Sequence, residues 1–246
     1  MRMIRLFSFF FLLSILGACG CAASKRTTFR IGVDPNWYPL NFEAFQPYVN
    51  GFTEDLLLEI SKYAGVDFVK MEANWDSLLD GLHEKQYDAV LTSFPSYQFN
   101  QVKYGFSKNF LDLGPVLVVP SNAQLNDLTK LSNEVVGIVM GDPAFLILQK
   151  YPEIIVRKYE TVPELLKAVV TGSLEGALLD RLVASSFVRD MYAEQLKIST
   201  DPLTDVGLHV MSLKGENERV IDLFDRTLSQ MKKQKKLQAL QAKWQL

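Results

Sequence analysis

Along this chain one pattern of apolar and polar positions occurs twice, at 78–93 and at 165–180, and the two copies align without gaps. Each copy begins as the end of an amphipathic helix and continues through a short turn into an apolar run typical of a buried parallel strand. The runs stop at polar residues, Thr92-Ser93 in the first copy and Asp180 in the second. Because ligands bind outside the carboxyl ends of such strands, the repeat predicts two similar α/β lobes that share a cleft. Chance similarity between two common helix–strand units is the alternative explanation.

The remaining predicted elements alternate between strands and helices, beginning with a strand at 29–33, and this alternation favours an α/β fold. Two crossovers are expected, so that the chain leaves the first lobe near residue 112 and returns to it near residue 204. The first lobe is therefore discontinuous. The expected boundaries are 29–112 with 204–246 for lobe 1 and 113–203 for lobe 2.

Helix start signals precede three of the predicted helices. Thr53 follows an expected turn at Gly51-Phe52 and is predicted to be the N-cap of the first helix. Asn74 is the expected cap of the helix in the first repeated unit, and Thr161 opens a capping-box pattern in the second. These caps place the two repeated strands directly after amphipathic helices.

Length and charge limit the classes of function. A chain of 246 residues is one large domain or two of ordinary size, and either can bury a sufficient core. The formal charge is −2, and it falls to −4 without the first 18 residues, whose only charged residues are Arg2 and Arg5. This slightly acidic balance argues against a nucleic-acid partner.

The amino terminus has the pattern of an export signal. A basic start at 1–5 precedes an apolar run of 11 residues at 6–16, which is too short to span a bilayer as a stable helix. The following Leu16-Gly17-Ala18-Cys19 resembles the bacterial lipobox, in which the cysteine becomes diacylated. An ordinary signal peptide with an incidental cysteine is the alternative.

From this pattern we predict a signal peptide at 1–18 and a tether at 19–28, with the soluble body held by acyl chains on Cys19. The protein is then lipid-anchored on the outer side of a bacterial membrane, in the periplasm if the cell has two membranes. Cys19 and Cys21 are the only cysteines, so acylation of Cys19 leaves no intramolecular disulfide. The exported body must then be stable through packing alone.

No sequence motif indicates catalysis. The chain has neither a G-x-S-x-G motif nor a P-loop, and both cysteines lie at the lipid end. His83 and His209 fall in different predicted elements, and each is interpreted as a structural histidine. We therefore expect no enzyme activity, no metal site and no cofactor.

Polar residues gather at four predicted strand ends, close to two tryptophans. Each aspartate taken alone is explained by the preference of this residue for caps and turns, and Trp37 is nearly as well explained by burial under its loop. Together the group indicates recognition of a small polar ligand. The residues are Asp34, Ser93, Asp142 and Asp180, beside Trp37 and Trp75.

Several short motifs, in their order and spacing, resemble the polar amino-acid-binding proteins of bacterial ABC importers, solute-binding family 3. The resemblance covers nearly the whole mature chain, and no single motif is specific. It implies a type II periplasmic-binding-protein fold, in which two α/β lobes joined by two hinge strands close on an amino acid. It also implies a membrane permease as partner and a monomer. The motifs are Ile31-Gly32-Val33-Asp34, Gly51 to Leu56, Trp75 to Leu79, Asp88 to Leu91, Phe106-Ser107, Val116 to Pro120, Glu175 to Asp180 and Lys243-Trp244.

The resemblance also implies roles for individual residues. Asp180 falls where the family binds the ligand's α-ammonium, and Trp37 and Trp75 fall where aromatic rings sandwich its side chain. Asp34 corresponds to a position that binds a side-chain amide or amine in some members. Thr92 and Ser93 lie where main chain and small polar groups hold the ligand.

Two departures from the family pattern concern the α-carboxylate. Asn100 stands where the family has its carboxylate-binding arginine, and Asp142 replaces the threonine that follows Gly141. Neutral asparagine cannot replace a bidentate, charge-assisted arginine contact. Acids without a matched cation favour a positively charged ligand, unless Arg181 or Lys103 turns inward. A sensor with an altered pocket and a dehydratase-like enzyme on the same fold are the alternatives.

Overall fold

The structure is a computed structural model that describes residues 26–246. The predicted signal peptide at 1–18, the predicted lipidation site Cys19 and most of the predicted tether at 19–28 lie outside the described residues. No helix within 26–246 is both long enough and apolar enough to cross a bilayer.

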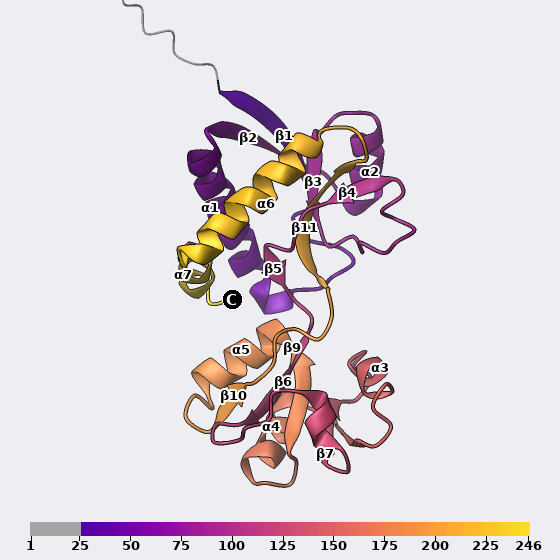
Figure 1. Ribbon diagram of the computed structural model, residues 1–246, viewed down its shortest axis with the longest axis vertical. Coiled ribbons are helices and arrows are strands. Elements are labelled where there is room, and N and C mark those ends of the chain that lie inside the picture. Colours follow the sequence, from indigo (N-terminus) through magenta and orange to yellow (C-terminus); the bar gives the residue numbers. More distant parts are fainter. Residues whose placement is uncertain (1–25) are drawn as a thin grey trace, which may run out of the picture.

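The chain forms two α/β lobes, each built on its own sheet (Figure 1). It passes from lobe 1 to lobe 2 at 112–115 and returns at 198–207. The boundaries expected at 112/113 and 203/204 fall inside these two connections. The predicted fold class, two α/β lobes joined by two segments, is confirmed.

Lobe 1 contains a sheet in the order β2-β1-β3-β11-β4, with β5 also paired to β11. The first three of these strands are parallel, whereas β11 runs antiparallel to β3, β4 and β5. The carboxyl ends of β1 and β3 consequently lie side by side at one edge of the sheet. The strands are β1 (Thr27–Val33), β2 (Val66–Glu72), β3 (Ala89–Thr92), β4 (Tyr104–Phe106), β5 (Leu111–Asp112) and β11 (Gly207–Leu213).

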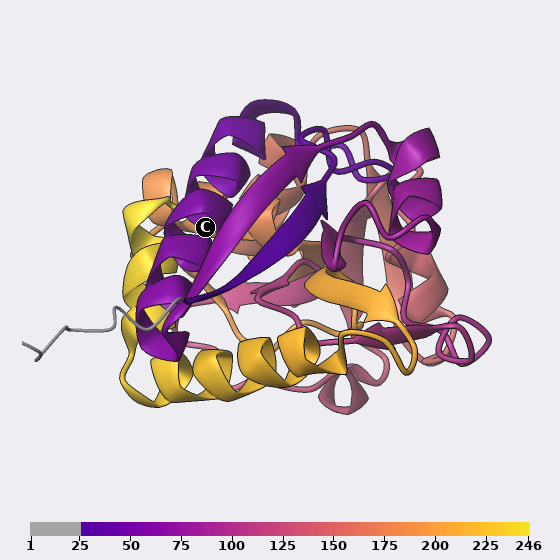
Figure 2. The same cartoon turned by 90° about the horizontal axis from the view of Figure 1, so that it is seen from above.

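Helices cover both faces of this sheet. One face packs on α1, α6 and α7, which also contact one another (Figure 2), and the other face packs on α2. A 3₁₀ turn, η1, leads into α1. The elements are η1 (Glu43–Phe45), α1 (Gln46–Ala64), α2 (Trp75–His83), α6 (Glu218–Lys233) and α7 (Lys236–Lys243).

Helix α1 begins seven residues before the predicted cap, which corrects the expected turn at Gly51-Phe52. Thr53 lies inside the helix, is buried, and its hydroxyl donates to the Val49 carbonyl at 2.8 Å. Gly51 lies inside α1, and the Trp244 ring packs directly on it, leaving no room for a side chain. A tertiary contact therefore explains a glycine that the sequence alone assigns to a turn.

Lobe 2 contains a sheet in the order β10-β6-β9-β7-β8. Strand β7 is parallel to β8 and β9, and β6 is antiparallel to β9 and β10. Alternate residues of β6 face two different cores, Val116 and Val118 one and Leu117 and Val119 the other. The elements are β6 (Pro115–Pro120), η2 (Leu128–Leu131), β7 (Val135–Val139), α3 (Phe145–Leu148), β8 (Ile155–Tyr159), α4 (Val162–Val170), β9 (Gly176–Asp180), α5 (Arg181–Asp190) and β10 (Leu196–Ile198).

The sequence repeat corresponds to equivalent units, α2–β3 in lobe 1 and α4–β9 in lobe 2. Each repeated strand lies between one parallel and one antiparallel neighbour. Two of the three predicted caps are confirmed, since Asn74 Oδ1 accepts from Ser77 N at 3.0 Å and Thr161 Oγ1 accepts from Glu164 N at 3.4 Å.

The two connections are hydrogen-bonded to each other. Leu113 N donates to Val206 O and Leu203 N donates to Pro115 O, both at 2.8 Å. A separate contact joins the lobes at the C-terminus, where the guanidinium of Arg189 on α5 donates to Gln245 O at 2.9 Å.

Candidate functional site

The strand ends of both lobes face a space between them. A cavity of about 300 Å³ has walls from the loop after β1, from the two connections and from the start of α5. Asp180 at the end of β9 lies on this cavity together with side chains of lobe 1. Of the four predicted strand-end residues Asp34, Ser93, Asp142 and Asp180, Asp180 is the one that lines this interlobe cavity.

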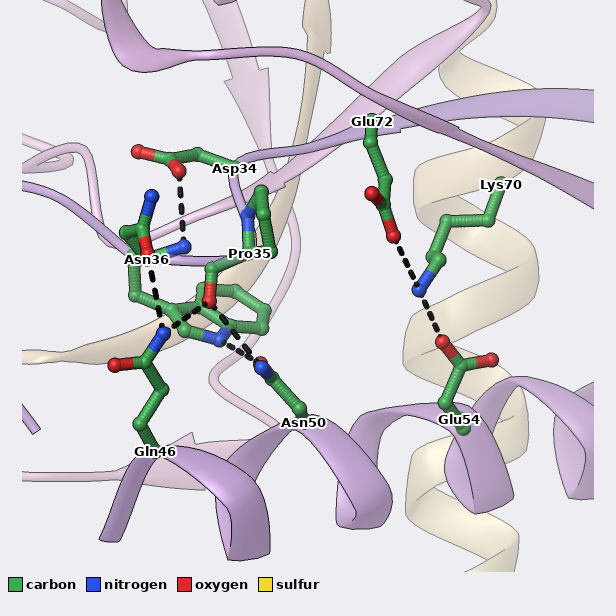
Figure 3. A network of polar contacts seen from close by, with 9 residues as sticks. Asp34, Pro35, Asn36, Gln46, Asn50, Glu54, Lys70 and Glu72 are labelled. Carbon is green, nitrogen blue, oxygen red and sulfur yellow. Dashed lines mark hydrogen bonds and ion pairs between the residues drawn. The ribbon is translucent and has the colours of Figure 1, made fainter. Parts of the chain in front are cut away.

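Asp34, at the end of β1, shapes the loop that follows it. Its carboxylate is buried and accepts from Asn36 N at 2.9 Å and from Tyr38 N at 3.3 Å (Figure 3). On α1, the Asn50 and Gln46 amides donate to the carbonyl of Pro35 at 3.2 and 3.1 Å. Both carboxylate oxygens of Asp34 thus accept hydrogen bonds from the backbone of the loop. This role differs from the ligand contact expected from the sequence.

Trp37 is a correction to the predicted site. Its side chain is 2 % exposed and belongs to the core of lobe 1, where Nε1 donates to Asn50 Oδ1 at 2.6 Å. The residue has φ 59°, a left-handed conformation that turns its ring under the loop. Its neighbour Tyr38 is 56 % exposed and is the aromatic residue of this loop that faces outward.

Tyr38 belongs to a row of aromatic rings in lobe 1. Its ring centroid lies 5.7 Å from that of Trp75, which lies 5.9 Å from Phe94, which lies 5.8 Å from Tyr104. Trp75 is half-buried because its ring packs between two of the others. Tyr38 and Trp75 therefore form an aromatic wall in lobe 1. The pair expected from the sequence was Trp37 and Trp75.

The end of β3 offers one unpaired hydroxyl. Thr92 is buried and its Oγ1 accepts from Phe94 N at 3.0 Å, so it fixes the turn after the strand. Ser93 Oγ, in contrast, is buried with no hydrogen-bond partner among residues 26–246. A buried hydroxyl without a partner is unfavourable and becomes satisfied if a ligand supplies an acceptor or donor.

Asn100 braces the loop between β3 and β4. Its Nδ2 donates to Pro95 O at 2.7 Å, and its own carbonyl accepts from Lys103 N and Tyr104 N, both at 3.0 Å. The asparagine therefore stabilises loop conformation, and in this structure it is not directed at the interlobe cavity.

Two carboxylates lie together at the lobe 2 edge. Gly141, with φ 82°, allows the turn after β7, and Asp142 Oδ1 then accepts from Ala144 N at 2.7 Å. At the end of the neighbouring β9, the exposed Asp180 carboxylate has neither a hydrogen bond nor an ion pair with any described residue. Desolvation by the surrounding protein, together with the Asp142 charge, raises the pKa of Asp180.

The cations that the sequence left as alternatives do not neutralise these acids. Arg181 Nη1 lies 3.8 Å from Asp112 Oδ2, at the first connection between the lobes. The Lys103 side chain is exposed on the loop of lobe 1. The acidic character expected for the lobe 2 edge is thus present in the structure.

The two histidines make hydrogen-bond contacts within lobe 1. His83 Nδ1 lies 2.8 Å from Leu79 O, and His209 Nε2 lies 2.9 Å from Phe94 O. His209 is buried, and desolvation lowers its pKa to about 4. Within the described part of the chain, no group of three or more His, Cys, Asp or Glu side chains is placed to hold a metal ion.

Sequence reasoning missed the segment after Tyr38. Residues 39–45 line the interlobe cavity, although no strand end or motif marks them. The sequence does give one indication that this segment forms part of a cavity wall. Leu40, Phe42 and Phe45 are three large apolar residues within seven residues between β1 and α1.

The family model for bacterial extracellular solute-binding proteins, family 3, matches residues 29–246. The chain belongs to this family. It is 24 % identical over 223 residues to the L-cystine-binding protein TcyJ of Escherichia coli strain K12, covering 89 % of this chain and 83 % of that protein. It is 22 % identical over 230 residues to the histidine-binding periplasmic protein of Salmonella typhimurium, covering 89 % and 88 %.

Solved structures have the same fold. The L-cystine solute receptor of Neisseria gonorrhoeae, in its unliganded open conformation, matches with a TM-score of 0.65 at 16 % identity, over 89 % of this chain and 93 % of that one. Substrate-binding domain 2 of Lactococcus lactis GlnP, also open, matches with a TM-score of 0.60 at 15 % identity, over 92 % and 98 %. These likenesses show the two-lobed fold of this family 3 protein.

Proposed function

We propose that this protein is the extracytoplasmic substrate-binding component of an amino-acid ABC importer, and that its ligand is a cationic amino acid or derivative. The relatives that match along most of their length are named as amino-acid-binding proteins. Lobe closure would bring ligand contacts from both sheets together, and the two hydrogen-bonded connections provide the hinge. The closed form would deliver the ligand to a membrane permease.

The observation that carries the charge preference is the pair of acids at the lobe 2 edge. Asp180 and Asp142 lie close enough for their charges to interact, and no described cation pairs with either of them. An ammonium or guanidinium group would offset this repulsion, whereas an anionic ligand would add to it. Tyr38 and Trp75 supply an aromatic wall that also favours cations.

Isothermal titration calorimetry with lysine, arginine, glutamine, glutamate and cystine tests the proposal. We expect lysine or arginine to bind and glutamate to give no heat. Asp180→Asn should weaken binding of the cationic ligand roughly fivefold, since Asp180 is exposed in this structure and an exposed ion pair contributes up to about 1 kcal/mol. Tight glutamate binding would refute the charge preference.

Membrane anchoring through Cys19 is part of the same proposal, supported by the lipobox-like Leu16-Gly17-Ala18-Cys19. Expression of the full chain in bacteria given radiolabelled palmitate should yield a labelled, membrane-bound protein. Cys19→Ser should remove both the label and the membrane association, and Cys21→Ser serves as the matched control. Equal labelling of wild type and Cys19→Ser would contradict acylation at this residue.

A further inference from the structure

The interlobe cavity has a mostly apolar wall beside Asp180, the last residue of β9. Its lining contains two charged side chains among the described residues, Glu43 and Asp180, and both are acidic. Most of the remaining wall is hydrocarbon. The lining consists of Pro39, Leu40, Asn41, Phe42, Glu43, Phe45, Leu113, Asp180, Leu182, Val183 and Val206.

Three parts of the molecule form this wall. Residues 39–45 come from lobe 1, Leu182 and Val183 come from α5 of lobe 2, and Leu113 and Val206 come from the two connections. An occupant would therefore contact both lobes and the hinge at once. Any such contact that differs between open and closed forms links occupancy of the cavity to closure.

The side chains that line the interlobe cavity indicate which kind of ligand it would bind. A cation belongs beside Asp180, which has no described partner, and Arg181 is not available to a ligand carboxylate there because it lies against Asp112. The rest of the occupant meets aliphatic and aromatic carbon. Val206 is 46 % exposed, so an apolar group placed against it would remove hydrocarbon surface from water.

We propose that this cavity is an apolar arm of the ligand cleft, and that the ligand is an organic ammonium compound with a large apolar group beside its nitrogen. A free N-terminal residue with a branched or aromatic side chain, and with its carboxyl group blocked or in a peptide bond, has this chemistry. The inference rests on the proposed function, because it assumes that Asp180 receives the ligand's ammonium group.

Calorimetry with alaninamide and phenylalaninamide tests the arm. Both probes carry one ammonium group and no carboxylate, and they differ in apolar bulk. Because each buried methylene multiplies affinity about fourfold, phenylalaninamide should bind roughly tenfold tighter or better. Affinities within twofold of each other would overturn the arm.

Tryptophan variants test whether the apolar arm causes the difference in affinity between the two amides. Val183→Trp fills the arm from α5, and the affinity ratio of the two amides should fall toward one. Val170→Trp, the same replacement at an exposed position of α4 outside the cavity, should leave the ratio unchanged. If Val183→Trp does not fold, Val206→Trp narrows the arm from the opposite wall, and a ratio that stays high in that variant would overturn the proposal.

The same titrations separate the two proposals. If lysinamide and alaninamide bind and lose affinity in Asp180→Asn, but phenylalaninamide has no advantage, the arm is wrong and the cationic site stands. If neither the amides nor lysine and arginine bind, the proposed function fails, and the arm fails with it.

Discussion

At the scale of residues, the lobe 2 edge keeps two acids close together without a cation. Asp142 uses one oxygen to hold its own turn, which leaves Asp180 as the carboxylate free for a ligand. A raised pKa means that the folded protein binds a proton at Asp180 more readily than the unfolded chain does. Ionised Asp180 at neutral pH therefore lowers the free energy of unfolding. Residues with perturbed pKa values are common at functional sites.

Asp180→Asn should consequently raise the melting temperature of the ligand-free protein at pH 7 while weakening ligand binding. The favourable contribution of protonated Asp180 is present below the pKa of the unfolded chain and is lost as the pH rises through the folded value. The gain in the variant should therefore disappear in acid. The measurement is differential scanning calorimetry at several pH values.

Asp190→Asn, at the other end of α5, is the matched control for this prediction. Hydrogen bonds from Arg189 lower the pKa of Asp190, so its removal should not stabilise the protein. Equal stabilisation by both variants would indicate a general charge effect instead of a local one.

The buried His209 should make the folded protein less stable in acid. Its pKa is lowered to about 4 in the folded protein, from 6.5, because the ring is buried against Phe94 and Asn109. The unfolded chain binds the proton first, so stability should decrease as pH falls from about 6.5 through 4, by up to about 3 kcal/mol.

His209→Gln keeps a donor for the Phe94 carbonyl and removes the titration. Urea unfolding at pH 7 and pH 4.5 should show a smaller difference for the variant than for the wild type. An identical difference in both proteins would show that other groups cause the acid sensitivity.

At the scale of elements, α1 and the C-terminal end of the chain depend on each other. The Trp244 ring packs on Gly51, and its Nε1 donates to Asp55 Oδ2 at 2.8 Å. A Cβ on Gly51 would lie 2.2 Å from the ring. The last residues of the chain therefore define which face of α1 is buried.

Gly51→Ala should destabilise the protein by up to about 2 kcal/mol. Alanine gains about 1 kcal/mol of helix propensity, but displacing a packed indole costs about 1–3 kcal/mol. Chemical denaturation measures the change. In a Trp244→Ala background the same substitution should be neutral or stabilising, and a loss that persists there would refute the steric explanation.

At the scale of the whole molecule, the two connections between the lobes lie against each other. Gly114 lies against Thr204 of the other connection, where a Cβ would approach the hydroxyl to 2.5 Å and the carbonyl oxygen to 2.7 Å. Because a backbone atom is involved, the two connections cannot separate without disturbing their hydrogen bonds. Close packing at this point controls how the lobes are oriented.

Gly114→Ala should lower stability by about 1–3 kcal/mol and weaken binding of a cationic ligand, although every residue of the site is retained. Small-angle X-ray scattering with and without lysine should show reduced compaction on ligand addition. Gly105→Ala, whose Cβ would meet only Ser212 Oγ at 3.6 Å, is the control. Compaction equal to the wild type would show that the hinge tolerates the change.

The sequence by itself determined the local order of the chain. The caps at Asn74 and Thr161, the alternation of elements and the repeated helix–strand unit all depend on neighbours within a few residues, so they are readable without a structure. The same patterns predicted a polar residue at the end of the second repeated strand, and this residue, Asp180, lines the interlobe cavity. Local hydrogen bonds and hydrophobic periodicity are sufficient for this level of description.

Only the tertiary structure decided which side chains face the cleft. Trp37 turns inward and Tyr38 outward because the left-handed backbone of one residue rotates the loop, and that rotation is stabilised by Asn50 on a different element. Gly51, which the sequence assigns to a turn, lies inside a helix, where a ring from the far end of the chain packs on it. Side-chain direction depends on contacts between distant segments, and such contacts leave no periodic signal in the sequence.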